Sequence, residues 1–136
     1  MIVLDTSAAL ARSLPSQASA GGEAFFGSVS AVLIAPAIFA FELRNALLRA
    51  ERRGLADRTI VEQSSLEFSS IVECRPWNAR PAALARLLDL ARRERLSLFD
   101  AAYLDLAMRE SAALASRDTA LIEAAQRLSV VVHDLR

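Results

Sequence analysis

Short apolar runs alternate along the chain with longer segments in which hydrophobic residues recur at helical spacing. The short runs fit buried strands, and they lie at 2–4, 31–36, 70–76, 112–116 and 129–133. The longer segments fit helices, and they lie at 7–14, 23–30, 37–53, 56–68, 80–94, 99–110 and 119–128. Strands separated by helices imply a mostly parallel sheet that helices cover on both faces. The pattern therefore predicts an α/β fold with a sheet of four or five strands.

Proline and glycine mark several boundaries of these elements. Pro15 should end the first helix, and the small residues of 15–22 predict a loop that is the most mobile part of the chain. Pro36 should open the following helix at its first turn, and Gly54 should end that helix. No repeat or linker divides the sequence, so we expect a single domain over 1–136.

The longest predicted helix has apolar side chains around most of its circumference, including Phe41 and Leu48, so we expect most of it to be buried. Glu42, Asn45 and Arg49 form a narrow polar stripe on the same helix. Such a stripe is typical of a solvated face, but it also places a carboxylate among packing residues. From the sequence, Glu42 can therefore belong either to a solvated face or to a functional site.

Two aspartates directly follow predicted strands. Asp5 comes after 2–4, and Asp118 comes shortly after 112–116. In parallel α/β sheets, ligands collect at the carboxyl ends of strands. Aspartate is also a favoured N-cap residue, worth about 1 kcal/mol. Each aspartate, taken alone, can be a cap or a ligand.

Asp100 lies on the predicted helix 99–110, beside the packing residue Tyr103. Asp105 and Arg109 should form an ordinary i, i+4 ion pair on the opposite, solvated face, which also includes Ala102. A buried carboxylate without a partner costs several kcal/mol or shifts its pKa. Asp100 therefore either caps its helix or belongs to a site.

A convergence of the four acids Asp5, Glu42, Asp100 and Asp118 would explain all these positions by one cause. At about 4 Å each pair of carboxylates repels by roughly 4 kcal/mol at an intermediate dielectric. Protons or metal ions would be needed to neutralise the cluster, and ligands that are all oxygens suit Mg²⁺ or Mn²⁺. Two such ions about 4 Å apart are a known device for phosphodiester hydrolysis.

The composition excludes several other chemistries. Acidic and basic residues balance at 16 each, and every basic residue is an arginine. Without lysine there is no P-loop, no phosphoacceptor receiver site and no Schiff base. The single His133 excludes a ribonuclease with two histidines, and the single Cys74 excludes an internal disulfide. Neither these residues nor Trp77 carries a motif.

The start of the chain lacks the features of a signal peptide, and no apolar run reaches the roughly 18 residues of a membrane span. We therefore expect a soluble cytoplasmic protein that does not contact a membrane.

Four segments resemble, in order and spacing, the motif blocks of the PIN-domain ribonucleases and especially the VapC toxins of toxin–antitoxin pairs. They are "MIVLDTSAAL", "FELRNALLRA", "LSLFDAAYLDLA" and "LASRDTALIEAA". The resemblance implies a PIN-like three-layer α/β/α domain with endoribonuclease activity that depends on Mg²⁺ (or Mn²⁺). By position, the catalytic and metal-binding acids are Asp5, Glu42, Asp100 and Asp118, and the supporting residues are Thr6, Asn45 and Ser116. Ser116 stands where threonine is common, and Thr119 where lysine often follows.

The same resemblance implies cleavage of RNA by activated water, with 5′-phosphate and 3′-hydroxyl ends. It also implies a VapB-like antitoxin as partner and a higher assembly with the antitoxin. We expect a homodimer as well, because two-fold dimers are the commonest oligomers. The arginines of 49–53 and 92–95 are either RNA contacts or solvated faces, because acids are interleaved with them. Phenylalanines at 25, 26, 39 and 41 are either core or a groove for the antitoxin.

Two alternatives remain on the same fold: a nuclease directed at DNA or flap structures, and a binding module without catalysis. A haloacid-dehalogenase phosphatase is excluded, because Ser7 stands in place of its second aspartate.

Overall fold

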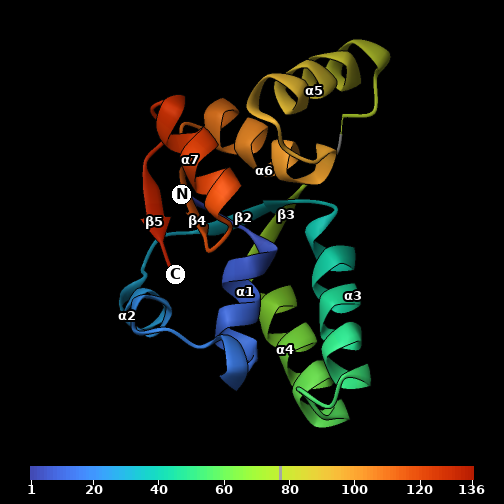
Figure 1. The fold of residues 1–136 in the computed structure, drawn as a ribbon, viewed down its shortest axis with the longest axis vertical. Coiled ribbons are helices and arrows are strands. Elements are labelled where there is room, and N and C mark those ends of the chain that lie inside the picture. Colours follow the sequence, from blue (N-terminus) through green and yellow to red (C-terminus); the bar gives the residue numbers. More distant parts are fainter. Residues whose placement is uncertain (77) are drawn as a thin grey trace.

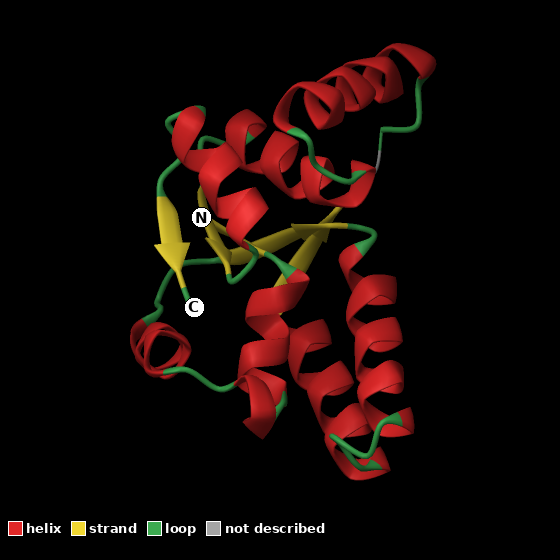
Figure 2. Cartoon of the chain, viewed as in Figure 1, coloured by secondary structure: helices red, strands yellow, loops and turns green. Residues whose placement is uncertain are grey.

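Residues 1–76 and 78–136 are described by the computed structural model; Trp77 lies outside them. Within these residues, five strands form one parallel sheet in the order β3-β2-β1-β4-β5 (Figure 2). The strands are β1 (Ile2–Leu4), β2 (Leu33–Pro36), β3 (Val72–Arg75), β4 (Ala113–Ser116) and β5 (Val132–Asp134). The predicted α/β class and parallel sheet are confirmed.

Seven α-helices surround the sheet in the described part of the chain. They are α1 (Thr6–Ser13), α2 (Ala20–Ser28), α3 (Phe39–Arg52), α4 (Arg58–Ile71), α5 (Pro81–Glu94), α6 (Leu98–Arg109) and α7 (Thr119–Arg127). Figure 1 shows α1, α3 and α4 on one side of the sheet and α6 and α7 on the other. The helix α5 packs against α6 as an outer element, and α2 lies beside β5 on the side of α1 (Figure 1). The architecture is the three-layer α/β/α arrangement that the resemblance implies.

The strand order places a topological switch at the centre of the sheet. The chain proceeds from β1 through β2 to β3 in one direction, and β4 and β5 lie on the other side of β1. The connection that follows β1 therefore leads toward β2, whereas the connection that follows β4 leads the other way, toward β5. In open α/β sheets the crevice at such a point, outside the carboxyl ends of the strands, is where ligands bind. Asp5 and Ser116 lie at this point, because β1 pairs with β4 up to Leu4 and Ala115.

The core explains why the short strands form. All residues of β1 and β2 are buried, because helices cover both faces of the sheet. Phe39 on α3 and Phe68 on α4 contact each other edge to face beneath the sheet. Phe25 and Phe39 are buried, which makes them core residues rather than a surface groove.

Several predicted boundaries were wrong. Pro36 ends β2 instead of opening a helix, and α3 begins three residues later at Phe39. The predicted loop 15–22 is largely ordered, because Pro15–Gln17 form a 3₁₀ turn and the Ser19 hydroxyl caps α2. Small residues suggest a loop, but here they allow α2 to pack closely against the end of the chain.

The faces of two helices also differ from the prediction. Phe41 is 75% exposed and Leu48 is 39% exposed, so α3 buries only the stripe toward α1 and α4. Ala102 is 6% exposed rather than solvated, because α5 covers that side of α6. Asp105 is consequently half-buried. Sequence periodicity locates an apolar stripe, but it does not show how many neighbours a helix has.

No helix in the described residues has the length and apolar character needed to cross a membrane.

Candidate functional site

Asp5 is held at the end of β1 by hydroxyl groups from both sides of the switch point. The residue is 4% exposed, and its carboxylate caps α1 by accepting the Ser7 backbone N–H. The Ser7 hydroxyl also contacts Asp5 Oδ2, and the Ser116 hydroxyl donates to the same oxygen at 2.8 Å. Every hydrogen bond to this carboxylate within the described residues reaches Oδ2. Oδ1 is therefore the oxygen left for a ligand.

The charge of Asp5 is costly in this position. Burial raises the pKa of its carboxyl, hydrogen bonds from Ser7 and Ser116 lower it, and the negative charge of Asp100 raises it again. The burial effect is the largest of these. A cation beside Asp5 would favour the ionised carboxylate and so lower its pKa.

The end of β4 is tied to the end of β1 through the same hydroxyls. Ser116 Oγ accepts the Asp118 backbone N–H at 2.9 Å, while Ser7 Oγ accepts the Arg117 backbone N–H at 2.9 Å. The Asp118 side chain is exposed and caps α7 by accepting the Leu121 N–H at 2.8 Å. Asp118 is thus linked to Asp5 through Ser116, and its carboxylate serves as the cap that the sequence allowed.

Glu42 lies in the first turn of α3 and is half-buried. Its Oε2 accepts a hydrogen bond of 2.6 Å from the hydroxyl of Tyr103, which lies 2.9 Å from Thr6 Oγ1. Burial raises the pKa of the Glu42 carboxyl, the Tyr103 bond lowers it, and the charges of Asp5 and Asp100 raise it further. Glu42 therefore lies in the electrostatic field of the other two acids.

Asp100 lies in the first turn of α6, next to the residue that caps this helix. The Ser97 hydroxyl accepts the Asp100 N–H at 3.0 Å and donates to Asp100 Oδ2 at 2.6 Å. The cap itself is Ser97, so the alternative in which Asp100 caps the helix is wrong. The charge of Asp100 reaches both Asp5 and Glu42, since it raises the pKa of each.

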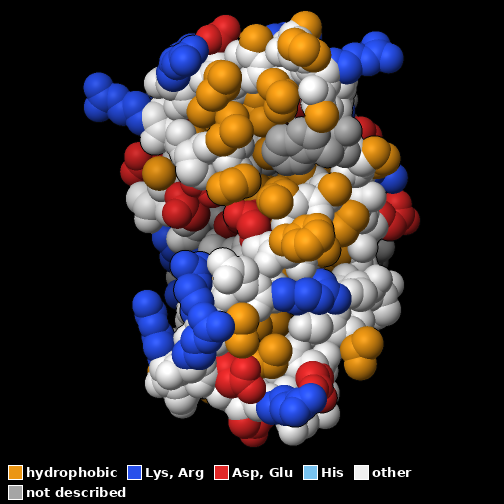
Figure 3. All heavy atoms as spheres, turned by 90° about the vertical axis from the view of Figure 1, so that its right-hand side faces the viewer, with side chains coloured by type: hydrophobic (Ala, Val, Ile, Leu, Met, Phe, Trp, Pro, Cys, Tyr) orange, Lys and Arg blue, Asp and Glu red, His pale blue; other side chains and the backbone are white. Residues whose placement is uncertain are grey.

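The structure therefore brings Asp5, Glu42 and Asp100 into one electrostatic cluster, here called the acid cluster. None of these residues is ion-paired with an arginine in the described part of the chain. Figure 3 shows acidic side chains near the middle of the face that carries α3 and α5. Hydrophobic side chains surround them toward α5, and arginines lie on the α3 side.

The chemistry of the acid cluster fits a hard divalent cation, but its carboxylates do not lie close enough together to form a complete metal site. Its carboxylate oxygens are the ligands that Mg²⁺ and Mn²⁺ prefer. Among residues 1–76 and 78–136, no three acidic, histidine or cysteine side chains already lie at metal-binding spacing. Asp5, Glu42 and Asp100 are the residues that could hold such an ion, because their carboxylates act on one another electrostatically.

Of the predicted supporting residues, Thr6 and Ser116 contact the cluster or its partners, while Asn45 is exposed on α3. Sequence reasoning missed Ser7 and treated Tyr103 only as packing. The signal for Ser7 was its place two residues after a capping aspartate. Only the fold shows the role of Tyr103, because its partners are far away in sequence.

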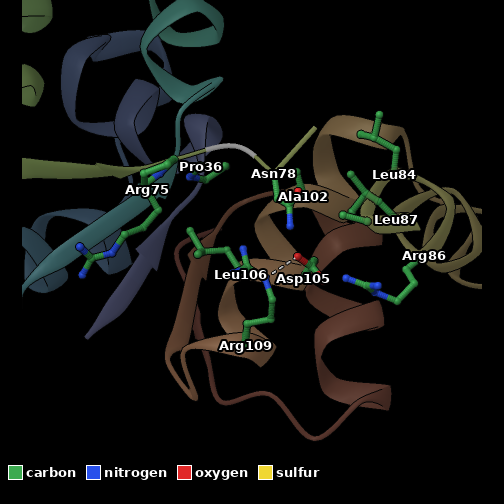
Figure 4. Close-up of a pocket in the computed structure, with 12 residues that line it drawn as sticks. Pro36, Arg75, Asn78, Leu84, Arg86, Leu87, Ala102, Asp105, Leu106 and Arg109 are labelled. Carbon is green, nitrogen blue, oxygen red and sulfur yellow. Dashed lines mark hydrogen bonds and ion pairs between the residues drawn. The ribbon is translucent and has the colours of Figure 1, made fainter. Parts of the chain in front are cut away.

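A separate small cavity of about 90 Å³ lies between α5, α6 and the ends of β2 and β3. Leu87 and the ion-paired Asp105 and Arg109 line it, and Arg86 extends toward it from α5 (Figure 4). None of the predicted site acids lines this cavity. Its lining mixes apolar side chains with arginines and Asp105, and it is separate from the acid cluster.

Comparison with solved structures shows the same fold in other proteins. The crystal structure of PAE2754 from Pyrobaculum aerophilum matches with a TM-score of 0.72 and 19% identity, over 97% of this chain and 83% of the other. FitAcB from Neisseria gonorrhoeae matches with a TM-score of 0.62 and 24% identity, over 97% and 96%. FitAB bound to an IR36 DNA fragment matches with a TM-score of 0.65 and 24% identity, over 97% and 93%.

No curated protein matches the sequence. The PIN domain, by contrast, matches residues 2–127, which include all four predicted acids. This match covers most of the sequence and agrees with the parallel five-stranded sheet and with the acids at its switch point. The chain belongs to the PIN domain family.

Proposed function

We propose that the protein is a metal-dependent endoribonuclease and the toxin of a VapBC-type toxin–antitoxin pair. PIN domains are generally nucleases and typically bind Mg²⁺. The observation that carries the proposal is the acid cluster: a buried Asp5 lies in the field of Asp100, and both act on Glu42. Within the described residues, no arginine forms an ion pair with any of the three. Such a cluster is unfavourable until a cation joins it.

Each residue of the site has a stated task in this proposal. Asp5, Glu42 and Asp100 would hold Mg²⁺ or Mn²⁺, and Asp118 would complete the site from the end of β4. When bound, the ion would supply the activation of water that phosphodiester hydrolysis needs. Ser7 and Ser116 fix Asp5 by Oδ2 and so direct Oδ1 toward the ligand. Ser97 orients the Asp100 carboxylate in the same way.

RNA is the proposed substrate, and the exposed arginines at the end of α3 are its proposed backbone contacts. Arg49, Arg52 and Arg53 are exposed there and free of ion pairs in the described residues. Guanidinium groups bind phosphate well. Arg92 and Arg93 are instead paired with acids, so the 92–95 run contributes less.

The proposed partners are a second copy of the chain and a VapB-like antitoxin. The exposed Phe41 is available to an amphipathic segment, whereas Phe25 and Phe39 are not. A basic antitoxin side chain that enters the acid cluster would pair with it and displace metal. An antitoxin with its C-terminal basic residues replaced by alanine should inhibit less tightly than the parent; equal inhibition would contradict this charge contact.

The function is tested by incubating the purified protein with end-labelled RNA. We expect cleavage with Mg²⁺ or Mn²⁺, none with EDTA, and 5′-phosphate ends. Undiminished cleavage in EDTA would overturn the metal mechanism, and 2′,3′-cyclic phosphate ends would show attack by the 2′-hydroxyl. A single-stranded DNA and a flap substrate, run in parallel, should be cut poorly; preference for either would favour the DNA-directed alternative.

A further inference from the structure

Tyr103 is the single tyrosine of the chain, and its hydroxyl group joins three helices at the acid cluster. The ring is 1% exposed within α6. The hydroxyl reaches Glu42 Oε2 on α3 at 2.6 Å and Thr6 Oγ1 at the start of α1 at 2.9 Å. These contacts span 61 and 97 residues of sequence, so they depend on the assembled fold.

The direction of these hydrogen bonds follows from the number of protons. A tyrosine hydroxyl has one proton, and an ionised carboxylate can only accept. Tyr103 therefore donates to Glu42, and Thr6 must donate to the Tyr103 oxygen. The three side chains form a directed chain that starts at the residue after Asp5 and ends on one oxygen of Glu42.

The result for Glu42 resembles the result for Asp5. A hydroxyl group holds Oε2, and no hydrogen bond within the described residues reaches Oε1. Asp5 is likewise held by hydroxyls at Oδ2 with Oδ1 left open. In both acids one oxygen is fixed to the fold and the other is available.

We propose that Tyr103, backed by Thr6, is a positioning residue that holds Glu42 by Oε2 and presents Oε1 to the divalent cation. This inference rests on the proposed metal-dependent function. Partners behind a metal ligand orient it, and their loss typically weakens metal affinity or activity by 10–100-fold.

The decisive variant is Tyr103→Phe, which removes only the hydroxyl. Titration calorimetry of Mn²⁺ into the folded variant should show affinity about 10–100-fold weaker than the original chain. Cleavage should recover when Mn²⁺ is raised to saturation, since the reacting groups are intact. Tighter binding would mean that Tyr103 restrains Glu42 away from the ion, and equal binding would mean that it only packs; either result overturns the proposal.

Thr6→Val provides a second variant if Tyr103→Phe does not fold. It removes the donor behind Tyr103 while leaving the tyrosine in place, so Mn²⁺ affinity should fall less than in Tyr103→Phe. Thr59→Val is the matched control, because Thr59 is an exposed threonine in the first turn of α4. It should bind Mn²⁺ as the original chain does. Equal affinity in Thr6→Val and Thr59→Val would contradict the directed chain.

A spectroscopic measurement on the metal-free protein separates this inference from the proposed function. Isotope-labelled tyrosine gives a single NMR signal here, and Glu42→Gln should shift it, whereas Asp105→Asn should not. An unchanged signal in Glu42→Gln would exclude the contact, whatever the metal does. If the original chain binds no Mn²⁺, the proposed metal centre fails; if it binds Mn²⁺ and Tyr103→Phe binds it equally, only the positioning role fails.

Discussion

Two groups of carboxylates in the molecule have different partners. Outside the acid cluster, many are ion-paired with arginine: Glu62, Glu67, Glu73, Asp89, Glu94, Asp105 and Asp134. Inside it, Asp5, Glu42 and Asp100 receive hydrogen bonds from hydroxyls and backbone N–H groups instead. Because all 16 basic residues are arginines, the absence of arginine from the cluster is not explained by scarcity.

This difference shows how a fold can position acids without neutralising their charge, so that they can still bind a cation. An arginine that pairs with a carboxylate balances its negative charge. A single hydroxyl occupies one oxygen and leaves the charge in place. The acid cluster is therefore held in position but remains electrostatically unsatisfied, whereas the paired acids need nothing more.

The comparison is sharpest on α6, where Asp100 and Asp105 lie on one helix in the two different environments. Asp100→Asn should reduce RNA cleavage by more than the roughly 100-fold upper range for residues behind a metal ligand. Asp105→Asn, the matched control, loses only the ion pair with Arg109 at 2.8 Å and should keep near-normal activity. Cleavage assays on both folded variants decide this. Similar losses would mean that the two environments do not differ in function.

Metal binding should stabilise the folded protein through the acid cluster and not through the acids that are paired with arginine. Mg²⁺ at about 100 times its dissociation constant should raise the free energy of unfolding by about 2.7 kcal/mol. Thermal unfolding with Mg²⁺ and with EDTA measures this gain. It should vanish in Asp5→Asn and persist in Asp89→Asn, whose carboxylate is exposed and paired with Arg92. A gain that survives in Asp5→Asn would place the ion elsewhere.

The two groups should also respond oppositely to pH in the metal-free protein. The pKa of Asp5 is raised by burial, so the unfolded chain releases this proton at a lower pH than the folded one. Stability should therefore fall as pH rises from the unfolded value near 4 through the raised value. Urea unfolding in EDTA should show this fall, and Asp5→Asn should flatten it and be more stable at neutral pH.

Asp134 provides the opposite case, because its bond with Arg136 lowers its pKa. The small contribution of Asp134 to the free energy of unfolding is present above the pKa of the unfolded chain. It is lost as the pH falls through the lowered pKa of the folded protein. Asp134→Asn should therefore leave unchanged the fall in stability that Asp5 causes in the metal-free protein as the pH rises. The same decline in Asp5→Asn as in the original chain would show that Asp5 does not carry the cost of the cluster.

Sequence periodicity predicted most of the elements, because buried strands and amphipathic helices leave strong local patterns. It failed where tertiary neighbours decide the outcome. Phe41 looks like a core residue in its helix but is 75% exposed, and Ala102 looks solvated but lies under α5. Ser19 caps α2 where small residues suggested a loop. Such errors arise because the sequence of one helix does not show which other elements pack against that helix.

The acids of the site could be predicted as residues, but their surroundings could not. Asp5 and Asp100 were identified by position, while the hydroxyls that hold Asp5 come from β4 and α1 together. Tyr103 meets Glu42 only because α3 and α6 approach each other at the end of β1. Their meeting depends on the strand order, which the sequence alone does not specify.

The smallest expected effect concerns the ion pairs themselves. Arg109→Ala removes the partner of Asp105, and exposed i, i+4 pairs on helices contribute only about 0.3–0.5 kcal/mol. Arg109 is more than half exposed, so salt should weaken the pair further. Urea unfolding at low and high salt should show a small loss that shrinks as salt rises, with RNA cleavage unaffected. A large loss, or a loss of cleavage, would mean that the arginine-paired acids also support the site, and the division into two groups would no longer hold.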